Sequence, residues 1–213
     1  MTVICPTVTA FDQHQYREQM GLVTAFAKRI HIDLMDGEFA PTVSLPLSQV
    51  WWPDDITADI HIMFQRPMEQ VEKLIALKPS LVVIQFEADV DHAEFARRLH
   101  KAGIKAGLGL MQATTVEAAA SVLNGFDHVM IFSGNLGYHG GSAVDFSLLD
   151  KVHEARRRYP KLEIAWDGGV NDTNVKRLVE GGVDVLNVGS FIHNADSPQA
   201  SYGLLQKLTK AAG

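Results

Sequence analysis

Cysteine and long apolar runs are both scarce in this chain of 213 residues. Its single cysteine, Cys5, excludes an intrachain disulfide, and the setting V-I-C-P indicates a buried small residue while leaving a reactive thiol open. No apolar run approaches the roughly 18 residues of a membrane-spanning helix, so no membrane partner is expected. The first residues, M-T-V-I-C-P-T-V-T-A, lack the charged and then apolar order of a signal peptide. These absences predict a cytoplasmic protein.

Positive charge is also in the minority. Lysine and arginine number 19 against 25 aspartate and glutamate residues, which gives a formal net charge of −6. A nucleic-acid partner therefore has little electrostatic support. The one basic cluster, Arg156-Arg157-Arg158, falls at the end of a predicted helix, where it complements the helix dipole. No Gly-x-Gly-x-x-Gly follows the first predicted strand, so a dinucleotide site is not supported.

Strand-like and helix-like segments alternate from one end of the chain to the other. Apolar, β-branched runs predict eight strands, at 2–8, 30–35, 58–63, 81–87, 104–110, 127–132, 162–166 and 184–188. Helix signals stand between them: a periodic pattern over 13–29, Pro67, an N-cap at Asp91 with Gly103 at the end, a capping box Thr114-x-x-Glu117, and Ser197-Pro198. After Asp36 there is room for only a short helix.

Eight such units predict a parallel sheet, because parallel neighbours need crossover connections. In a chain of this length they favour an α/β fold with a single (β/α)8 barrel over residues 1–213, since no linker or low-complexity segment divides it. A doubly wound open sheet is the alternative. In a barrel, the carboxyl ends of the strands meet at one mouth, where active sites are built.

Four polar residues stand where three of these runs end, in R-I-H-I-D-L-M-D-G, A-D-I-H-I-M-F and L-E-I-A-W-D-G-G. They are His31, Asp33, His61 and Asp167. Any one alone is more often a hydrogen-bonded strand terminus, but His31 and Asp33 share a strand face and all four occupy the same relative position. Two imidazoles and two carboxylates suit one divalent metal ion: zinc, iron(II), manganese or cobalt. The pattern therefore predicts metal-assisted acid–base chemistry.

Small residues cluster after the last three predicted strands. The clusters are Gly140-Gly141-Ser142, Gly168-Gly169 and Gly189-Ser190. Glycine lets backbone N–H groups approach an anion closely, and the loops after strands seven and eight are the usual phosphate site of a barrel. Each pair alone could simply serve a tight turn, but together they predict a phosphorylated substrate.

Several motifs occur in a fixed order along nearly the whole chain: H-I-D-L-M-D-G followed by F-A-P, H-I-M at 61–63, E-A at 87–88, W-D-G-G-V-N, and V-G-S. In these segments the chain resembles the ribulose-phosphate 3-epimerase family, as a divergent member. The resemblance implies a barrel of the ribulose-phosphate-binding type. It also implies a divalent metal held by His31, Asp33, His61 and Asp167, with Asp33 and Asp167 as the catalytic acid–base pair.

The implied reaction inverts C3 of a ketose phosphate, D-ribulose 5-phosphate to D-xylulose 5-phosphate, a step of the pentose phosphate pathway. One aspartate removes the proton beside the ketone and the other returns it to the opposite face, through an enediolate that the metal stabilises. The resemblance further implies substrate contacts at Met35, Met63 and Met130. The family's substrate-contacting serine becomes Thr9 or Ala10.

Other positions depart from the family pattern. A family histidine in strand four aligns with Gln85, Glu38 replaces another, and the loop N-P-G-F-G-G-Q is replaced by S-G-N-L-G-Y-H-G-G-S. We expect Tyr138 and His139, beside the paired glycines, to discriminate among sugars.

Two alternatives are therefore kept: a 3-epimerase of a hexulose 6-phosphate of the allulose 6-phosphate type, and a non-catalytic sugar-phosphate-binding barrel. Related barrels that decarboxylate or condense use Asp-x-Lys-x-x-Asp, whereas Asp33 is followed by Leu34 and Met35 with no lysine in place. The sequence leaves a homo-oligomer open.

Overall fold

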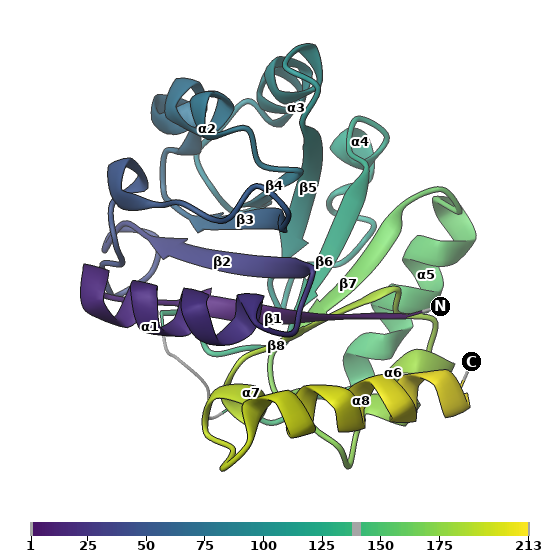
Figure 1. Cartoon of the computed structure of the whole chain (residues 1–213). Coiled ribbons are helices and arrows are strands. Elements are labelled where there is room, and N and C mark those ends of the chain that lie inside the picture. The colour runs from purple at the N-terminus through teal and green to yellow at the C-terminus, as the bar shows by residue number, and fades with distance from the viewer. Residues whose placement is uncertain (1, 138–141, 213) are drawn as a thin grey trace.

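Eight parallel strands, hydrogen-bonded in chain order, close into a barrel in the computed structural model, which describes residues 2–137 and 142–212 (Figure 1). The strands are β1 (Val3–Thr9), β2 (Arg29–Met35), β3 (Thr57–Met63), β4 (Leu81–Gln85), β5 (Lys105–Leu110), β6 (His128–Phe132), β7 (Glu163–Asp167) and β8 (Val185–Val188). Pairing of β1 with β8 completes the ring. The predicted (β/α)8 barrel is confirmed, and the open-sheet alternative is wrong.

Helices surround the strands on the outside of the ring (Figure 1). They are α1 (Gln13–Thr24), α2 (Val71–Leu77), α3 (His92–Lys101), α4 (Ala120–Leu123), α5 (Leu149–Arg158), α6 (Val175–Glu180), α7 (Ser190–His193) and α8 (Pro198–Ala212), with short 3₁₀ helices η1 (Leu47–Gln49), η2 (Pro67–Gln70) and η3 (Phe146–Leu148). The second unit contains only η1 in the place of a helix, as its sequence predicts.

The helix signals in the sequence mark real helix ends in most cases. Asp91 caps α3 by accepting a hydrogen bond from the N–H of Glu94 at 3.0 Å, and Gly103 follows the helix with a φ of 77°. Pro67 opens η2, which leads directly into α2. Helix α1 ends at Thr24 rather than at 29, because Arg29 already pairs with Thr57 as the first residue of β2.

The capping box predicted at Thr114-x-x-Glu117 is wrong. The helix of this unit begins only at Ala120, and the hydroxyl of Thr114 bonds to the carboxylate of Glu87, which follows β4. Thr115 instead accepts a hydrogen bond from the N–H of Ala118 at 3.1 Å. A tertiary partner therefore takes the hydroxyl that the local pattern assigns to a cap.

Side chains along each strand point alternately toward the surrounding helices and into the barrel, which divides the core into two parts. Side chains such as Ile32, Ile60 and Ile84 are fully buried and belong to the large apolar cluster that includes Phe95 of α3. The intervening positions point into the barrel, where they stack in layers. Cys5 lies there, fully buried as predicted, and burial raises the pKa of its thiol well above the ordinary value, which favours the protonated thiol over the thiolate.

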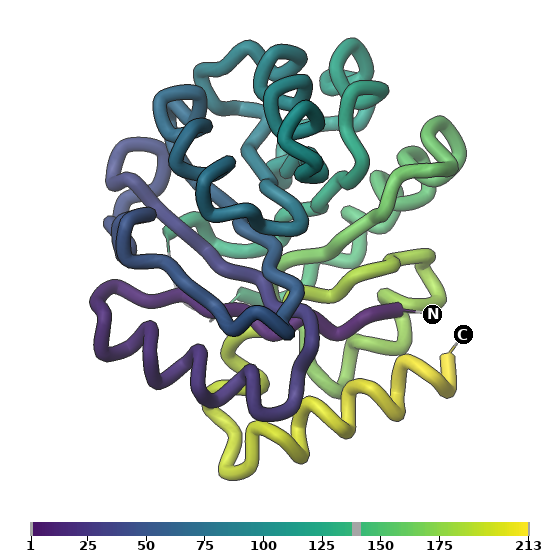
Figure 2. Tube along the Cα trace, turned by 45° about the horizontal axis from the view of Figure 1, so that its top comes forward, coloured from purple at the N-terminus to yellow at the C-terminus, as the bar shows by residue number. Residues whose placement is uncertain are grey.

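The closure of the barrel brings the two ends of the chain together. In both views the N- and C-terminal labels lie near each other, and α8 runs along the outside beside β1 (Figures 1 and 2). Within the ranges 2–137 and 142–212, no helix combines the length and the apolar character that crossing a membrane requires.

Candidate active site

The four predicted metal ligands meet at the carboxyl ends of the strands. His31 and Asp33 lie on β2, His61 on β3 and Asp167 at the last position of β7, and one ligand atom from each lies within 4.8 Å of the others. Register explains the meeting, because Asp33 pairs with His61 across the β2–β3 ladder. The i and i+2 spacing of His31 and Asp33 then places both side chains inside the barrel.

The contacts within this cluster leave two carboxylates, one buried and one partly buried, facing two imidazoles. Asp33 Oδ1 lies 2.9 Å from His61 Nδ1 and 3.3 Å from His31 Nε2, and Asp167 Oδ2 lies 3.4 Å from His31 Nε2. Among the residues that the structure describes, no lysine or arginine forms an ion pair with either carboxylate. Two nitrogen and two oxygen donors without a permanent cation fit a borderline divalent metal ion.

The two carboxyl groups differ in acidity. Burial alone would raise the pKa of Asp33, but the charges and hydrogen bonds of His31 and His61 outweigh it and hold that pKa well below its ordinary range. Burial raises the pKa of Asp167, and the nearby charge of Asp33 raises it further. Environments that separate the pKa values of paired carboxyl groups are typical of acid–base sites.

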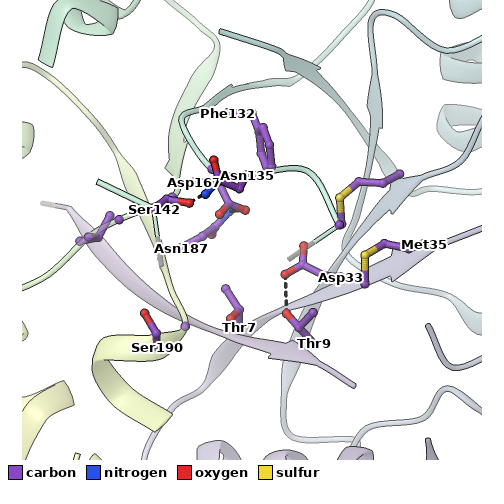
Figure 3. Close-up of a pocket in the computed structure, with 17 residues that line it drawn as sticks. Thr7, Thr9, Asp33, Met35, Phe132, Asn135, Ser142, Asp167, Asn187 and Ser190 are labelled. Atoms are coloured by element: carbon purple, nitrogen blue, oxygen red, sulfur yellow. Dashed lines mark hydrogen bonds between the residues drawn. The ribbon is translucent and has the colours of Figure 1, made fainter. Parts of the chain in front are cut away.

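A pocket opens over this cluster (Figure 3). The lining includes both aspartates and these predicted substrate contacts: Thr9, Met35, Met63, Gly168, Gly169, Gly189 and Ser190. Figure 3 shows Ser142 and Ser190 on the side of the pocket away from Met35.

Of the two candidates Thr9 and Ala10, Thr9 is the one that lines the pocket. Its hydroxyl donates to Asp33 Oδ2 at 2.8 Å, a bond drawn as a dashed line in Figure 3. Since His61 already contacts Oδ1 of the same carboxylate, both oxygens of Asp33 have a partner.

Other predicted contacts lie elsewhere. Met130 is fully buried and is not among the residues that line the pocket, and its sulfur lies 3.5 Å from Asn187 Nδ2. The positions predicted at Tyr138, His139, Gly140 and Gly141 lie outside the described residues.

Sequence reasoning missed four polar or aromatic residues of the lining: Thr7, Phe132, Asn135 and Asn187. Asn187 Nδ2 lies 3.3 Å from Asp167 Oδ2, so it is a partner of a predicted acid–base residue. A signal for two of them is present in the alternation of the strands. Thr7 stands two residues before Thr9, and Asn187 is a polar residue in the otherwise apolar V-L-N-V, two residues before Gly189.

The glycines at the small-residue side are required by the backbone itself. Gly168 has a φ of 113°, and a Cβ there would lie 2.3 Å from the backbone nitrogen of Gly134. Gly169 has a φ of 75°, and a Cβ there would lie 2.8 Å from the backbone nitrogen of Val144. A Cβ on Gly189 would instead meet the Thr7 hydroxyl oxygen at 2.7 Å, within the pocket.

The model of the ribulose-phosphate 3 epimerase family matches residues 3–193. A ribulose-phosphate 3-epimerase of Mycobacterium tuberculosis is 30% identical to the chain over 217 aligned positions, which cover 99% of this chain and 94% of that protein. The chain belongs to the ribulose-phosphate 3-epimerase family. A ribulose-phosphate 3-epimerase of Aquifex aeolicus is 27% identical, over 100% of this chain and 99% of that protein.

Structural neighbours of this family member share its fold. A 3-hexulose-6-phosphate synthase of Salmonella typhimurium superposes with a TM-score of 0.71 at 15% identity, covering 100% of both chains. KGPDC from Streptococcus mutans superposes with a TM-score of 0.78 at 11% identity, covering 99% of this chain and 98% of that one. At such low identities these superpositions show the barrel alone.

The departures from the family pattern lie in different surroundings. Glu38 is exposed and pairs with Arg66, with 2.6 Å between Oε1 and a guanidinium nitrogen. It is not among the residues that line the pocket. Gln85 is fully buried beside His61. In the altered loop, the N–H of Asn135 donates to the hydroxyl of Ser142 at 2.9 Å, and both residues line the pocket.

Proposed function

We propose that this family member is a metal-dependent epimerase that inverts C3 of a ketose phosphate, converting D-ribulose 5-phosphate to D-xylulose 5-phosphate in the pentose phosphate pathway. The observation that carries the proposal is the meeting of two carboxyl groups, buried Asp33 and partly buried Asp167, in one pocket from different strands. Inversion needs one group to take a proton and another to return it from the opposite face. A single base would return the proton to the face it came from.

The surroundings of each carboxyl group support its part in proton transfer. Asp33, with a low pKa, is ionised and so is able to accept the first proton. In the site without a metal ion, Asp167 has the higher pKa of the two and is therefore the candidate to return the proton. The hydroxyl of Thr9 and the amide of Asn187 hold Asp33 and Asp167, respectively, in fixed orientations.

His31, Asp33, His61 and Asp167 would hold the divalent metal ion. When bound, the ion would supply positive charge that stabilises the negative charge developing on the substrate oxygens. The phosphate group would lie at Gly168-Gly169 and Gly189-Ser190, where backbone N–H groups can donate to its oxygens. The reacting carbon would then lie between the two aspartates, a placement that supports direct proton transfer.

A substrate panel tests the proposal. The protein is loaded in turn with zinc, iron(II), manganese and cobalt, and turnover is measured for D-ribulose 5-phosphate, D-allulose 6-phosphate and unphosphorylated D-ribulose. We expect the highest kcat/KM with D-ribulose 5-phosphate and a value at least roughly a hundredfold lower without the phosphate, since its charge-assisted hydrogen bonds are lost.

Other results on this panel contradict the proposal in distinct ways. A higher kcat/KM with D-allulose 6-phosphate would replace the pentulose with a hexulose 6-phosphate as the substrate. Saturable binding of sugar phosphates without turnover under any metal would indicate a non-catalytic sugar-phosphate-binding barrel. Equal turnover of free and phosphorylated D-ribulose would remove the phosphate site.

A further inference from the structure

Gln85, the last residue of β4, carries an amide that the acid–base mechanism leaves unexplained. The residue is fully buried, and its Nε2 lies 3.1 Å from His61 Nε2. Its other amide atom, Oε1, has no hydrogen-bond partner among the residues that the structure describes. A buried polar atom without a partner costs about 1–3 kcal/mol, so such a side chain needs a compensating role.

The neighbouring strand is built to accommodate this amide. Gly109 of β5 pairs with Gln85 in the ladder, and a Cβ on Gly109 would lie only 2.5 Å from Gln85 Oε1. Any larger residue at this position would therefore push the amide from its place beside His61. The absence of a side chain at Gly109 therefore provides the space that the Gln85 amide occupies.

The two nitrogens of His61 have different surroundings. Nδ1 faces the metal cluster and lies 2.9 Å from Asp33 Oδ1, whereas Nε2 lies beside the Gln85 amide. A neutral histidine that binds a metal through one nitrogen carries its proton on the other. If Nδ1 is the ligand atom, Nε2 carries that proton and requires an acceptor.

We propose that Gln85 is a positioning residue for the metal ligand His61. Its Oε1 accepts the hydrogen bond from His61 Nε2–H and so keeps the lone pair of Nδ1 directed at the metal. Turning the amide over places Oε1 where Nε2 stands, because the two ends of a glutamine amide occupy equivalent positions. This role rests on the metal site of the proposed function.

A neutral acceptor suits this place. The cluster already contains the carboxyl groups of Asp33 and Asp167, without a lysine or arginine partner among the described residues. An amide oxygen orients the imidazole without adding a third negative charge to the barrel interior. Glutamine therefore orients His61 without changing the net charge of the site.

Metal affinity tests the role without any measurement of turnover. Metal-free wild type, Gln85→Leu and Gln85→Glu are titrated with Co²⁺ alone, and the Kd is obtained by competition with a chelator. We expect Gln85→Leu to weaken Co²⁺ binding roughly 10- to 100-fold, the usual cost of losing an outer partner of a metal ligand. Gln85→Glu keeps an acceptor oxygen and is expected to bind within about threefold of wild type or more tightly.

A pair of glycine variants provides a matched control. Gly109→Ala displaces the Gln85 amide, whereas Gly107→Ala adds the same methyl group to the same strand and face but meets Val83, at 2.8 Å. We expect Gly109→Ala to weaken Co²⁺ binding and Gly107→Ala to leave it unchanged. In the zinc-loaded protein, NMR should show a slowly exchanging His61 Nε2 proton in wild type that is lost in Gln85→Leu.

The possible results separate this inference from the proposed function. A wild-type Co²⁺ Kd in Gln85→Leu, or an equal loss in Gln85→Leu and Gln85→Glu, would overturn the positioning role while leaving the metal site intact. A wild type that binds no Co²⁺ would refute the proposed function and this role with it. Should Gln85→Leu not fold, equal Co²⁺ affinities in the two glycine variants would overturn the role.

Discussion

The two ends of the barrel interior contain similar side chains, many of them from the same strands, but they balance charge differently. At the amino-terminal end, Arg29 of β2 donates to Asp59 of β3 at 2.7 Å and to both oxygens of Glu163 of β7 at 2.8 and 2.7 Å. His128 Nδ1 also lies 2.9 Å from a Glu163 oxygen. One arginine thus pairs with both of these carboxylates.

At the mouth, the same three strands supply His31, Asp33, His61 and Asp167, and no arginine or lysine joins them among the described residues. The amino-terminal end therefore has an arginine to balance its carboxylates, whereas the mouth has two imidazoles and is the candidate site for a metal ion. Within R-I-H-I-D, a structural arginine and a candidate catalytic aspartate stand at opposite ends of one short run. The comparison indicates that stability and function are divided along the length of each strand.

The largest effect is expected from substituting the two aspartates at the mouth of the barrel. Asp33→Asn and Asp167→Asn should each lower kcat for epimerisation by about a thousandfold or more, because an amide cannot exchange protons as a carboxyl group does. The metal-free Asp167→Asn variant should be at least as stable as wild type, because burial and the charge of Asp33 oppose ionisation of Asp167. The metal-free Asp33→Asn variant should be less stable, because it loses the contacts with His31 and His61 that favour the charged carboxylate. Steady-state kinetics, solvent deuterium incorporation, metal content and urea unfolding measure these quantities. Turnover close to wild type in either variant would refute the two-base mechanism.

The next effect concerns the amino-terminal end. Arg29→Met leaves Asp59 and Glu163 without their cation, and should lower the free energy of unfolding by about 3–5 kcal/mol. At a temperature where the variant is folded, kcat/KM should remain within about twofold of wild type, because the change is distant from the reacting groups. Urea unfolding and steady-state kinetics measure the two quantities. A large fall in kcat/KM with unchanged stability would contradict the division between the two ends.

Lowering the pH should weaken the same ion network without any substitution. Burial opposes ionisation of Glu163, but the hydrogen bonds of Arg29 and His128 hold its pKa well below the ordinary value. Because the folded-state pKa is the lower one, this contribution is complete above the unfolded value of about 4.3 and is lost as the pH falls below it. Glu163→Gln should cost about 2 kcal/mol of unfolding free energy at pH 7 and progressively less below about pH 4. A difference that does not shrink in acid would contradict this assignment.

The smallest effect concerns the expected phosphate side of the mouth. Gly189→Ala brings a methyl group against the Thr7 hydroxyl, and should raise KM for the phosphorylated sugar roughly three- to tenfold with little change in kcat. Gly203→Ala in α8 is the control, because nothing lies within 4 Å of its added Cβ. A KM as low in Gly189→Ala as in the control would show that this loop does not bind the phosphate group.

Local spacing was enough to predict the barrel and the convergence of the four candidate ligands. Strand alternation places His31 and Asp33 on one face, and the common rule that parallel strands end at one mouth brings His61 and Asp167 to them. Neither step needs knowledge of contacts between strands. The same spacing could not rank Met130 against Phe132, because both point inward and only their depth along β6 separates them.

The contacts of the Gln85 and Asn187 amides could not be predicted from local sequence patterns, for a related reason. The place of Gln85 depends on Gly109 across the ladder, and that of Asn187 on its pairing with Asp167. Register between strands is set by the closure of the whole barrel rather than by either strand alone. The failed capping box at Thr114 has the same origin, since its hydroxyl bonds to Glu87, which is 27 positions away in the chain.

The close approach of Gly168 to the backbone of Gly134 has a consequence for protein engineering. Asp167 accepts a backbone hydrogen bond from Ser133 at 2.7 Å, and the next residue leaves no room for a side chain between the two loops. These loops therefore behave as one module. A chimera that grafts a relative's loop between β6 and α5 should also import the segment that follows β7, or it would displace the aspartate it was meant to serve.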